Sequence, residues 1–114
     1  MKARILRYFR APGGIEPYWE WLDGLGDRNI RARILARIDR LEDGNFGDHR
    51  SVGEGVLELR MDFGPGYRVY CGQEGSVIIL LLCGGDKSTQ AEDISRAKAY
   101  WRMYRTGGRK RGKG

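Results

Sequence analysis

Apolar and polar side chains alternate between residues 53 and 87 in a way that predicts three antiparallel strands. Over residues 57–63 every second side chain is apolar and the others are charged, which is the two-residue period of a half-buried strand. Residues 67–72 alternate similarly, whereas residues 77–83 are apolar throughout, as in a central strand covered on both faces. This third strand is predicted to form the core of the sheet.

A turn between the first two of these strands determines which side chains share a face. Residues 63–66, Phe-Gly-Pro-Gly, are typical of a chain reversal. We expect Asp62 to lie opposite Arg68, which pairs residues of equal parity across the hairpin. Arg60, Arg68 and Tyr70 then share one face of the sheet. Two guanidinium groups and a phenol on an open sheet face predict an anion-binding site.

The remaining hydrophobic patterns predict one more strand and three helices. Residues 2–9 contain a short apolar patch that predicts a strand, and residues 16–25 repeat large apolar side chains at helical spacing. Asp27 can cap a second amphipathic helix over residues 28–43, whose arginines could contact RNA or simply face solvent. Residues 90–104 predict a last helix. The order is strand, two helices, three strands and helix, which indicates an α+β fold.

The segment that follows the apolar strand superficially resembles a phosphate-binding loop. Residues 84–88 are Gly-Gly-Asp-Lys-Ser, but Asp86 stands where the Walker pattern requires a glycine directly before Lys87. A nucleotide-binding loop is therefore excluded. Thr89 and Glu92 have the spacing of a capping box for the last helix.

The polar residues 45–55 predict a loop, which holds His49, the only histidine of the chain. With no second histidine, no cysteine nearby and no His-Glu spacing, the sequence predicts neither a metal site nor a cofactor. Cys71 and Cys83 are expected to be buried free thiols.

Composition predicts a single domain in 114 residues. No apolar run reaches the roughly 18 residues that span a bilayer, and the N-terminus lacks a signal-peptide pattern, so we expect a cytoplasmic protein.

The net charge of +6 is concentrated at the C-terminus, because residues 1–104 hold 16 basic and 15 acidic side chains. Residues 105–114 form a basic tail that we expect to be disordered. The tail could hold phosphate non-specifically or simply be solvated. Its candidate RNA or ribosome contacts are Arg105, Arg109, Lys110 and Arg111.

Residues 55–70 and 77–101 resemble the signature of the addiction-module killer proteins, a branch of the RelE/ParE toxin superfamily related to the HigB toxins. The similarity runs from about residue 5 to residue 101, with the turn, the apolar strand and the Gly-Gly-Asp-Lys-Ser-Thr-Gln segment in the same order. It implies two N-terminal helices packed on an antiparallel sheet, in the order β-α-α-β-β-β, with a C-terminal helix. It also implies neutralisation by an antitoxin, which in this branch is usually a small helix-turn-helix protein.

The resemblance leaves more than one activity open. Relatives of the RelE and HigB type cleave mRNA in the ribosomal A site without a metal ion, and we expect this activity here. ParE-type relatives poison DNA gyrase on the same fold. A third possibility is a module that binds RNA or docks an antitoxin without chemistry.

Cleavage through the 2′-hydroxyl of RNA requires a proton acceptor, stabilisation of the phosphorane and a proton donor for the 5′-oxygen. RelE-like ribonucleases use Lys, Arg and Tyr for these tasks. Arg68 matches the family's Gly-Tyr-Arg arginine and is the predicted transition-state stabiliser, assisted by Arg60. Lys87 and Tyr70, or Tyr67, complete the predicted site.

The proton acceptor is a separate question, because Glu58 stands where RelE has lysines. A carboxylate beside a phosphate is repelled, so Glu58 can act as the base only if Arg60 or Arg68 offsets its charge. Tyr70 and His49 are the alternatives.

Ion pairing is the alternative role for the predicted cations. Arg60 has Glu58 and Asp62 within reach across the hairpin, and Lys87 has Asp86 or Asp93. Exposed pairs of this kind contribute only about 0 to 1 kcal/mol.

Overall fold

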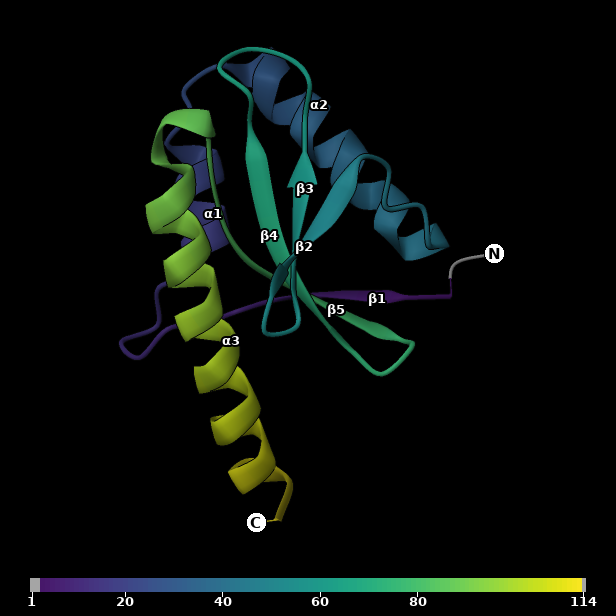
Figure 1. The fold of residues 1–114 in the computed structure, drawn as a ribbon, viewed down its shortest axis with the longest axis vertical. Helices are drawn as coiled ribbons and strands as arrows, with labels where there is room; N and C mark the ends of the chain where they lie inside the picture. The colour runs from purple at the N-terminus through teal and green to yellow at the C-terminus, as the bar shows by residue number, and fades with distance from the viewer. Residues whose placement is uncertain (1–2, 114) are drawn as a thin grey trace.

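A five-stranded mixed sheet lies between two layers of helix (Figure 1). The computed structural model describes the backbone of residues 3–113 and the side chains of residues 3–107. The strands are β1 (Ile5–Tyr8), β2 (His49–Gly53), β3 (Val56–Arg60), β4 (Arg68–Glu74) and β5 (Ile78–Gly85). Their order across the sheet is β1-β5-β4-β3-β2. The predicted α+β class is confirmed.

The strand pairing differs from the purely antiparallel sheet that the resemblance implied. β1 pairs with β5 in parallel, and the other neighbours are antiparallel. The N–H of Ile5 donates to the carbonyl of Val77 (2.8 Å), and that of Phe9 donates to Leu81 (2.9 Å). The apolar β5 needs a neighbour on each side to satisfy its backbone groups, and β1 is that neighbour on the side away from β4. The sheet is therefore mixed.

Two helices cover one face of the sheet. They are α1 (Pro17–Asp23) and α2 (Arg28–Asp39), and α2 continues into a 3-10 turn (Arg40–Asp43). Asp27 caps α2 as predicted, because its carboxylate accepts hydrogen bonds from the N–H groups of Asn29 (2.9 Å) and Ile30 (3.1 Å). The buried side chains of this first core are Tyr18, Leu22, Ile34, Ile38, Leu41, Leu59, Met61, Tyr67, Val69, Cys71, Ile79 and Leu81.

The third helix packs on the opposite face of the sheet. A 3-10 turn (Lys87–Thr89) leads into α3 (Gln90–Lys113), and the buried members of this second core are Phe9, Val56, Tyr70, Leu80, Leu82, Cys83, Ala97 and Trp101. Gly72 accommodates the indole of Trp101, since a Cβ there would lie 2.4 Å from its Cε3 atom. The face that was expected to be open is therefore partly covered by α3.

α3 is longer than expected. The helix was predicted to end near residue 104, but its backbone continues to Lys113. The disorder expected for residues 105–114 stays a prediction. Glycine lowers helix stability by about 1 kcal/mol relative to alanine, and the glycines at positions 107 and 108 favoured the earlier end. The division into a domain over residues 1–104 and a separate basic tail stays a prediction.

A further strand, β2, replaces the predicted loop over residues 45–55. It pairs with β3 at the edge of the sheet, with an irregularity between Ser51 and Gly53. Most of its side chains are exposed, so no apolar alternation marked it in the sequence. The turn after it places Glu54 at a φ of +56°, between Gly53 and Gly55.

The β3-β4 hairpin has the predicted parity in a different register. Arg60 lies directly opposite Arg68, so the expected pairing of Asp62 with Arg68 was wrong by two positions. A shift of two leaves every side chain on its predicted face. Arg60, Arg68 and Tyr70 consequently share the face that α3 partly covers.

Both cysteines are buried and free, as expected. Burial raises the pKa of the Cys71 thiol and of the Cys83 thiol to about 12, so both thiols are neutral at physiological pH. No helix within residues 3–113 is long and apolar enough to cross a membrane.

Candidate functional site

Charged side chains form two rows across the sheet on the α3 side. In the first row Arg50 of β2 lies opposite Glu58 of β3, which lies opposite Tyr70 of β4. In the second row Arg60 lies opposite Arg68. Like charges placed directly opposite each other destabilise a sheet, so this face requires nearby carboxylates.

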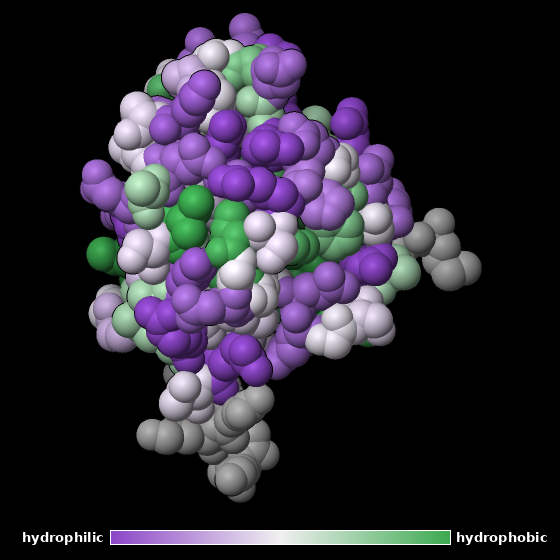
Figure 2. All heavy atoms as spheres, in the orientation of Figure 1, coloured by the Kyte–Doolittle hydropathy of each residue, from purple (hydrophilic) through white to green (hydrophobic). Residues whose placement is uncertain are grey.

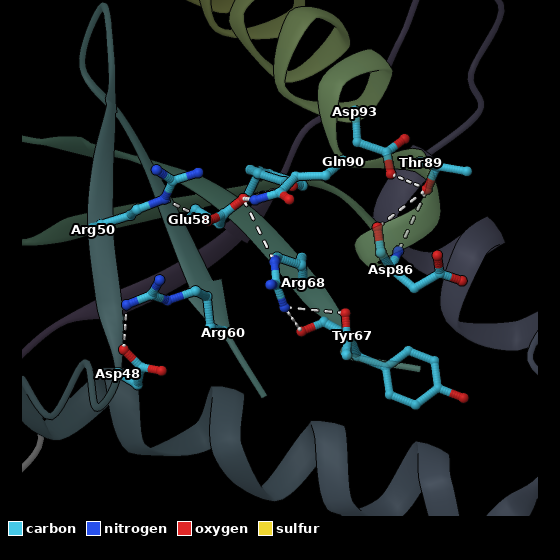
Figure 3. Close-up of polar contacts among 12 residues, drawn as sticks. Asp48, Arg50, Glu58, Arg60, Tyr67, Arg68, Asp86, Thr89, Gln90 and Asp93 are labelled. Atoms are coloured by element: carbon cyan, nitrogen blue, oxygen red, sulfur yellow. Dashed lines mark hydrogen bonds and ion pairs between the residues drawn. The ribbon is translucent and has the colours of Figure 1, made fainter. Parts of the chain in front are cut away.

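Glu58 is the centre of this arrangement, fully buried and hydrogen-bonded on both carboxylate oxygens (Figure 3). Oε1 accepts from Nε of Arg50 (2.8 Å), and Oε2 accepts from the hydroxyl of Tyr70 (2.9 Å) and from Nε2 of Gln90 (2.8 Å). The Nε of Arg68 lies 3.8 Å from Oε2. Burial raises the pKa of Glu58, but the hydrogen bonds from Arg50, Gln90 and Tyr70 outweigh it, and the pKa is lowered overall. Glu58 is therefore ionised at neutral pH.

The surroundings of Glu58 bear on its suitability as a base. The negative charge of Glu58 is offset by Arg50 and Arg68. Of the two arginines named from the sequence for this role, Arg68 is present and Arg60 is not. A carboxylate with a lowered pKa and three hydrogen-bond donors is a weaker proton acceptor than a free one. The identity of the general base stays a prediction.

The lowered pKa of Glu58 predicts a specific loss of stability in acid. A carboxyl whose pKa is lower when folded contributes stability above its unfolded pKa, about 4.3 for glutamate, and loses it as the pH falls through the folded pKa. We expect the difference in unfolding free energy between wild type and Glu58→Gln to be largest near neutral pH and to shrink below about pH 4. Urea unfolding at a series of pH values measures it. A difference independent of pH would contradict the prediction.

Arg68 is largely buried, with 13% of its side chain exposed. Its Nη1 donates to the carbonyl of Gly66 (3.1 Å), and its Nε points toward Glu58 (Figure 3). Arg60 is more exposed and pairs with Asp48 (2.9 Å), whereas the alternative role considered from the sequence was a pair with Glu58 or Asp62. Asp48 directly precedes β2, so this partner could not be anticipated without that strand.

Lys87 lies next to Arg68 across the turn that precedes β4. A Cβ placed at Gly66 would lie 3.4 Å from Nη1 of Arg68 and 3.5 Å from Cβ of Lys87, so both residues border the same glycine. Asp86 accepts a hydrogen bond from the N–H of Ser88, and Asp93 accepts hydrogen bonds from the hydroxyl of Thr89 and from Arg96. Among the side chains of residues 3–107, the ammonium of Lys87 has no hydrogen-bond or ion-pair partner, so it does not form the alternative ion pair with Asp86 or Asp93.

The Gly-Gly-Asp-Lys segment has a structural role that involves no bound phosphate. Asp86 is the N-cap of the 3-10 turn, and Thr89 completes a capping box with it, so the box expected from Thr89 and Glu92 was wrong. A Cβ on Gly85 would lie 1.8 Å from Oδ2 of Asp93. Only glycine allows the helix to approach the strand this closely.

The predicted tyrosines do not face solvent. Tyr70 is fully buried, and its pKa is raised by burial and by the hydrogen bond to Glu58. RNA cannot contact its hydroxyl in this conformation. Tyr67 belongs to the first core, where its ring lies 6.3 Å from that of Trp21 and 5.6 Å from that of Phe63.

His49 lies on the other side of the sheet from the two rows. It pairs with Leu59 of the first core, and its Nδ1 lies 2.8 Å from the carbonyl of Gly47. The structure therefore does not bring His49 together with Arg68. Within residues 3–107 no group of three or more histidine, cysteine or acidic side chains is placed to hold a metal ion.

Figure 2 shows the molecule in the orientation of Figure 1, with a mainly hydrophilic surface and hydrophobic side chains gathered in a smaller area. Arg105 is exposed on α3, with its guanidinium carbon 5.8 Å from the ring centroid of Trp101. The side chains of Arg109, Lys110 and Arg111 lie outside the described residues.

The model of one protein family, described as Phage derived protein Gp49-like (DUF891), matches residues 20–103. The chain belongs to the Gp49-like family. This family is part of the RelE/HigB-like toxin superfamily, and its members are toxin-type modules typically paired with an antitoxin. A protein of Haemophilus influenzae, described only as uncharacterized, is 55% identical over 78 residues, which are 68% of this chain and 79% of that protein. No solved structure matches the chain.

The Gp49-like match contains both rows of the site and Lys87, but not the tail cations beyond residue 103. Sequence reasoning missed Arg50, Gln90 and Asp48 as members of this cluster. The Gly-Glu-Gly segment at residues 53–55 was the signal that could have revealed β2, because glycines between two short polar segments are typical of a hairpin turn.

Proposed function

We propose that this Gp49-like protein is the toxin of a type II toxin-antitoxin system and that it inhibits translation by cleaving mRNA on the ribosome. Within the superfamily we place it in the HigB-like branch and in the cytoplasm, where ribosomes are found. The observation that carries the proposal is the cluster of Arg50, Arg60 and Arg68 on one sheet face, with Lys87 beside it. Guanidinium groups bind phosphate with paired hydrogen bonds, and single-stranded RNA carries one phosphate at each nucleotide along its backbone.

The proposed reaction uses the RNA's own 2′-hydroxyl as the nucleophile. Its oxygen attacks the adjacent phosphorus, the 5′-oxygen leaves, and the products are a 2′,3′-cyclic phosphate and a 5′-hydroxyl. Arg68 stabilises the negative charge of the phosphorane, and the ammonium of Lys87 protonates the departing oxygen. The base stays open among Glu58, Tyr70 and His49. Glu58 is ionised, but like Tyr70 it is fully buried in this conformation, so either side chain must become exposed before it can accept the proton of the 2′-hydroxyl.

The test is to express the chain and map the 5′ ends of cellular mRNA. We expect cuts phased with codons, because the ribosome presents mRNA in its reading frame. DNA breaks with intact mRNA would instead identify a gyrase poison of the ParE type. Intact mRNA and intact DNA would identify a docking module without chemistry.

The antitoxin is expected to block the same face. We propose a helix-turn-helix partner that covers Arg60, Arg68 and Lys87 or displaces α3, because neutralisation requires blocking the site or its docking to the ribosome. Amide hydrogen exchange with and without the antitoxin measures this. Protection confined to residues 28–43, with the sheet and α3 unchanged, would contradict the direct form of the proposal.

The C-terminal cations are proposed as additional RNA or ribosome contacts. Residues 105–114 contain five basic side chains and no acidic one, and phosphate neutralisation by such segments does not depend on nucleotide sequence. The proposed contacts are Arg105, Arg109, Lys110 and Arg111.

A further inference from the structure

We propose that Arg50 is a second phosphate-binding residue of this site and that it holds the phosphate next to the scissile one in single-stranded RNA. The inference rests on the proposed ribonuclease function. Nothing in the sequence pattern pointed to Arg50, because it lies on the edge strand β2 that the sequence did not predict.

The guanidinium of Arg50 is anchored at one nitrogen and free at the others. Its Nε donates to Oε1 of Glu58 (2.8 Å), and 48% of its side chain is exposed. Its Nη1 and Nη2 have no hydrogen-bond partner among the side chains and backbone of residues 3–107. A guanidinium carries five N–H donors in a fixed plane, so this anchoring leaves four donors oriented and available.

Glu58 places Arg50 and Arg68 on its two different oxygens. Arg50 contacts Oε1 at 2.8 Å, and the Nε of Arg68 lies 3.8 Å from Oε2 (Figure 3). Without this carboxylate the two guanidinium groups would repel each other. Glu58 thus acts as a positioning residue, because its single carboxylate holds the two guanidinium groups on either side of it. Two cations arranged in this way fit two neighbouring phosphates of one RNA strand.

Arg68 and Arg50 differ in burial, and we therefore expect them to have different roles in the reaction. Arg68 is mostly buried and lies beside Lys87, so its charge is poorly screened and acts strongly on the charge that develops in the transition state. Arg50 is half exposed at the sheet edge, where a phosphate is bound with equal strength before and during the reaction. Such uniform binding lowers KM without changing kcat.

Arg96 is a matched control for a purely structural role of Arg50. Its side chain is also 48% exposed, and it also pairs with a buried carboxylate, that of Asp93 (3.0 Å). Asp93 holds no second arginine among the ion pairs of residues 3–107. If Arg50 served only to neutralise Glu58, alanine at position 50 and alanine at position 96 would have similar effects on RNA.

The experiment measures KM and kcat for cleavage of ribosome-bound mRNA, and binding of a non-cleavable 2′-O-methyl RNA at several salt concentrations. For Arg50→Ala we expect KM to rise about ten- to a hundredfold, as for a lost hydrogen bond to a charged group, with kcat within about twofold of wild type. The salt dependence of RNA binding should decrease by about 0.7 in log-log slope, the value for one phosphate contact on a single strand. Arg96→Ala should change none of these quantities.

Arg50→Gln is the second variant, since it removes the charge while keeping an N–H donor for Glu58, and it should raise KM in the same way. Equal effects of Arg50→Ala and Arg96→Ala would overturn the inference while leaving the ribonuclease function intact. A fall in kcat at unchanged KM for either Arg50 variant would also overturn it. A wild-type protein that cleaves no mRNA would remove the proposed function, and the inference with it.

Discussion

Arg68→Ala is expected to lower the rate of mRNA cleavage about 10²- to 10³-fold, the usual cost of removing one donor that stabilises developing charge. Arg68 is the least exposed arginine of the two rows, and its Nη1 is held by the carbonyl of Gly66, so its orientation is set before RNA binds. Arg68→Lys should recover little activity, because an ammonium cannot make the two-point contact of a guanidinium. Cleavage of ribosome-bound mRNA under single-turnover conditions measures the effect.

The stability of the Arg68→Ala protein is expected to fall by about 1 kcal/mol. The sequence had placed Arg68 on an open face, where the change would cost less, but only 13% of its side chain is exposed. The cost stays modest because Glu58 keeps its donors from Arg50, Tyr70 and Gln90.

Arg60→Ala is the control for this experiment and should cost less activity, since Arg60 is 38% exposed and paired with Asp48. A folded Arg68→Ala protein that cleaved mRNA at the wild-type rate would exclude Arg68 from the mechanism and leave Lys87 as the leading candidate.

Val69→Asp is expected to abolish folding. Val69 is fully buried in the first core, on the face opposite to Arg68 and Tyr70. An unpaired carboxylate in an apolar core, together with the lost packing, costs more than about 4 kcal/mol, a large part of the roughly 5 to 15 kcal/mol that stabilises a domain of this size. Soluble expression and circular dichroism measure the outcome.

Val77→Asp makes the same chemical change at a position that is 44% exposed. It should leave folding within about 0.5 kcal/mol of wild type, as surface changes usually do. If both variants folded equally well, the assignment of Val69 to the core would be wrong.

The strands and their faces were predictable because the direction of a side chain along a strand is a local property. The alternation over residues 57–63 put Glu58 and Arg60 on the opposite face from Leu57 and Leu59, and the structure confirms this. The hairpin register was wrong by two positions, yet no side chain changed face.

β2 was not predictable in the same way. An edge strand with exposed side chains has no apolar period, and β2 is held by its pairing with β3. Two contacts of the site were missed together with β2. Arg50, on this strand, donates to Glu58, and Asp48, just before it, accepts from Arg60.

The sequence by itself determined the α+β order, the capping of α2 and the placing of Arg60, Arg68 and Tyr70 on one face, since each depends on local spacing and side-chain chemistry. Only the tertiary structure decided which of these groups are buried and what they contact. Gln90 reaches Glu58 from 32 positions away, and α3 buries Tyr70 by packing Trp101 against Gly72. Such contacts depend on the docking of a helix and an edge strand onto the sheet, and no local pattern encodes which distant partner a side chain will meet.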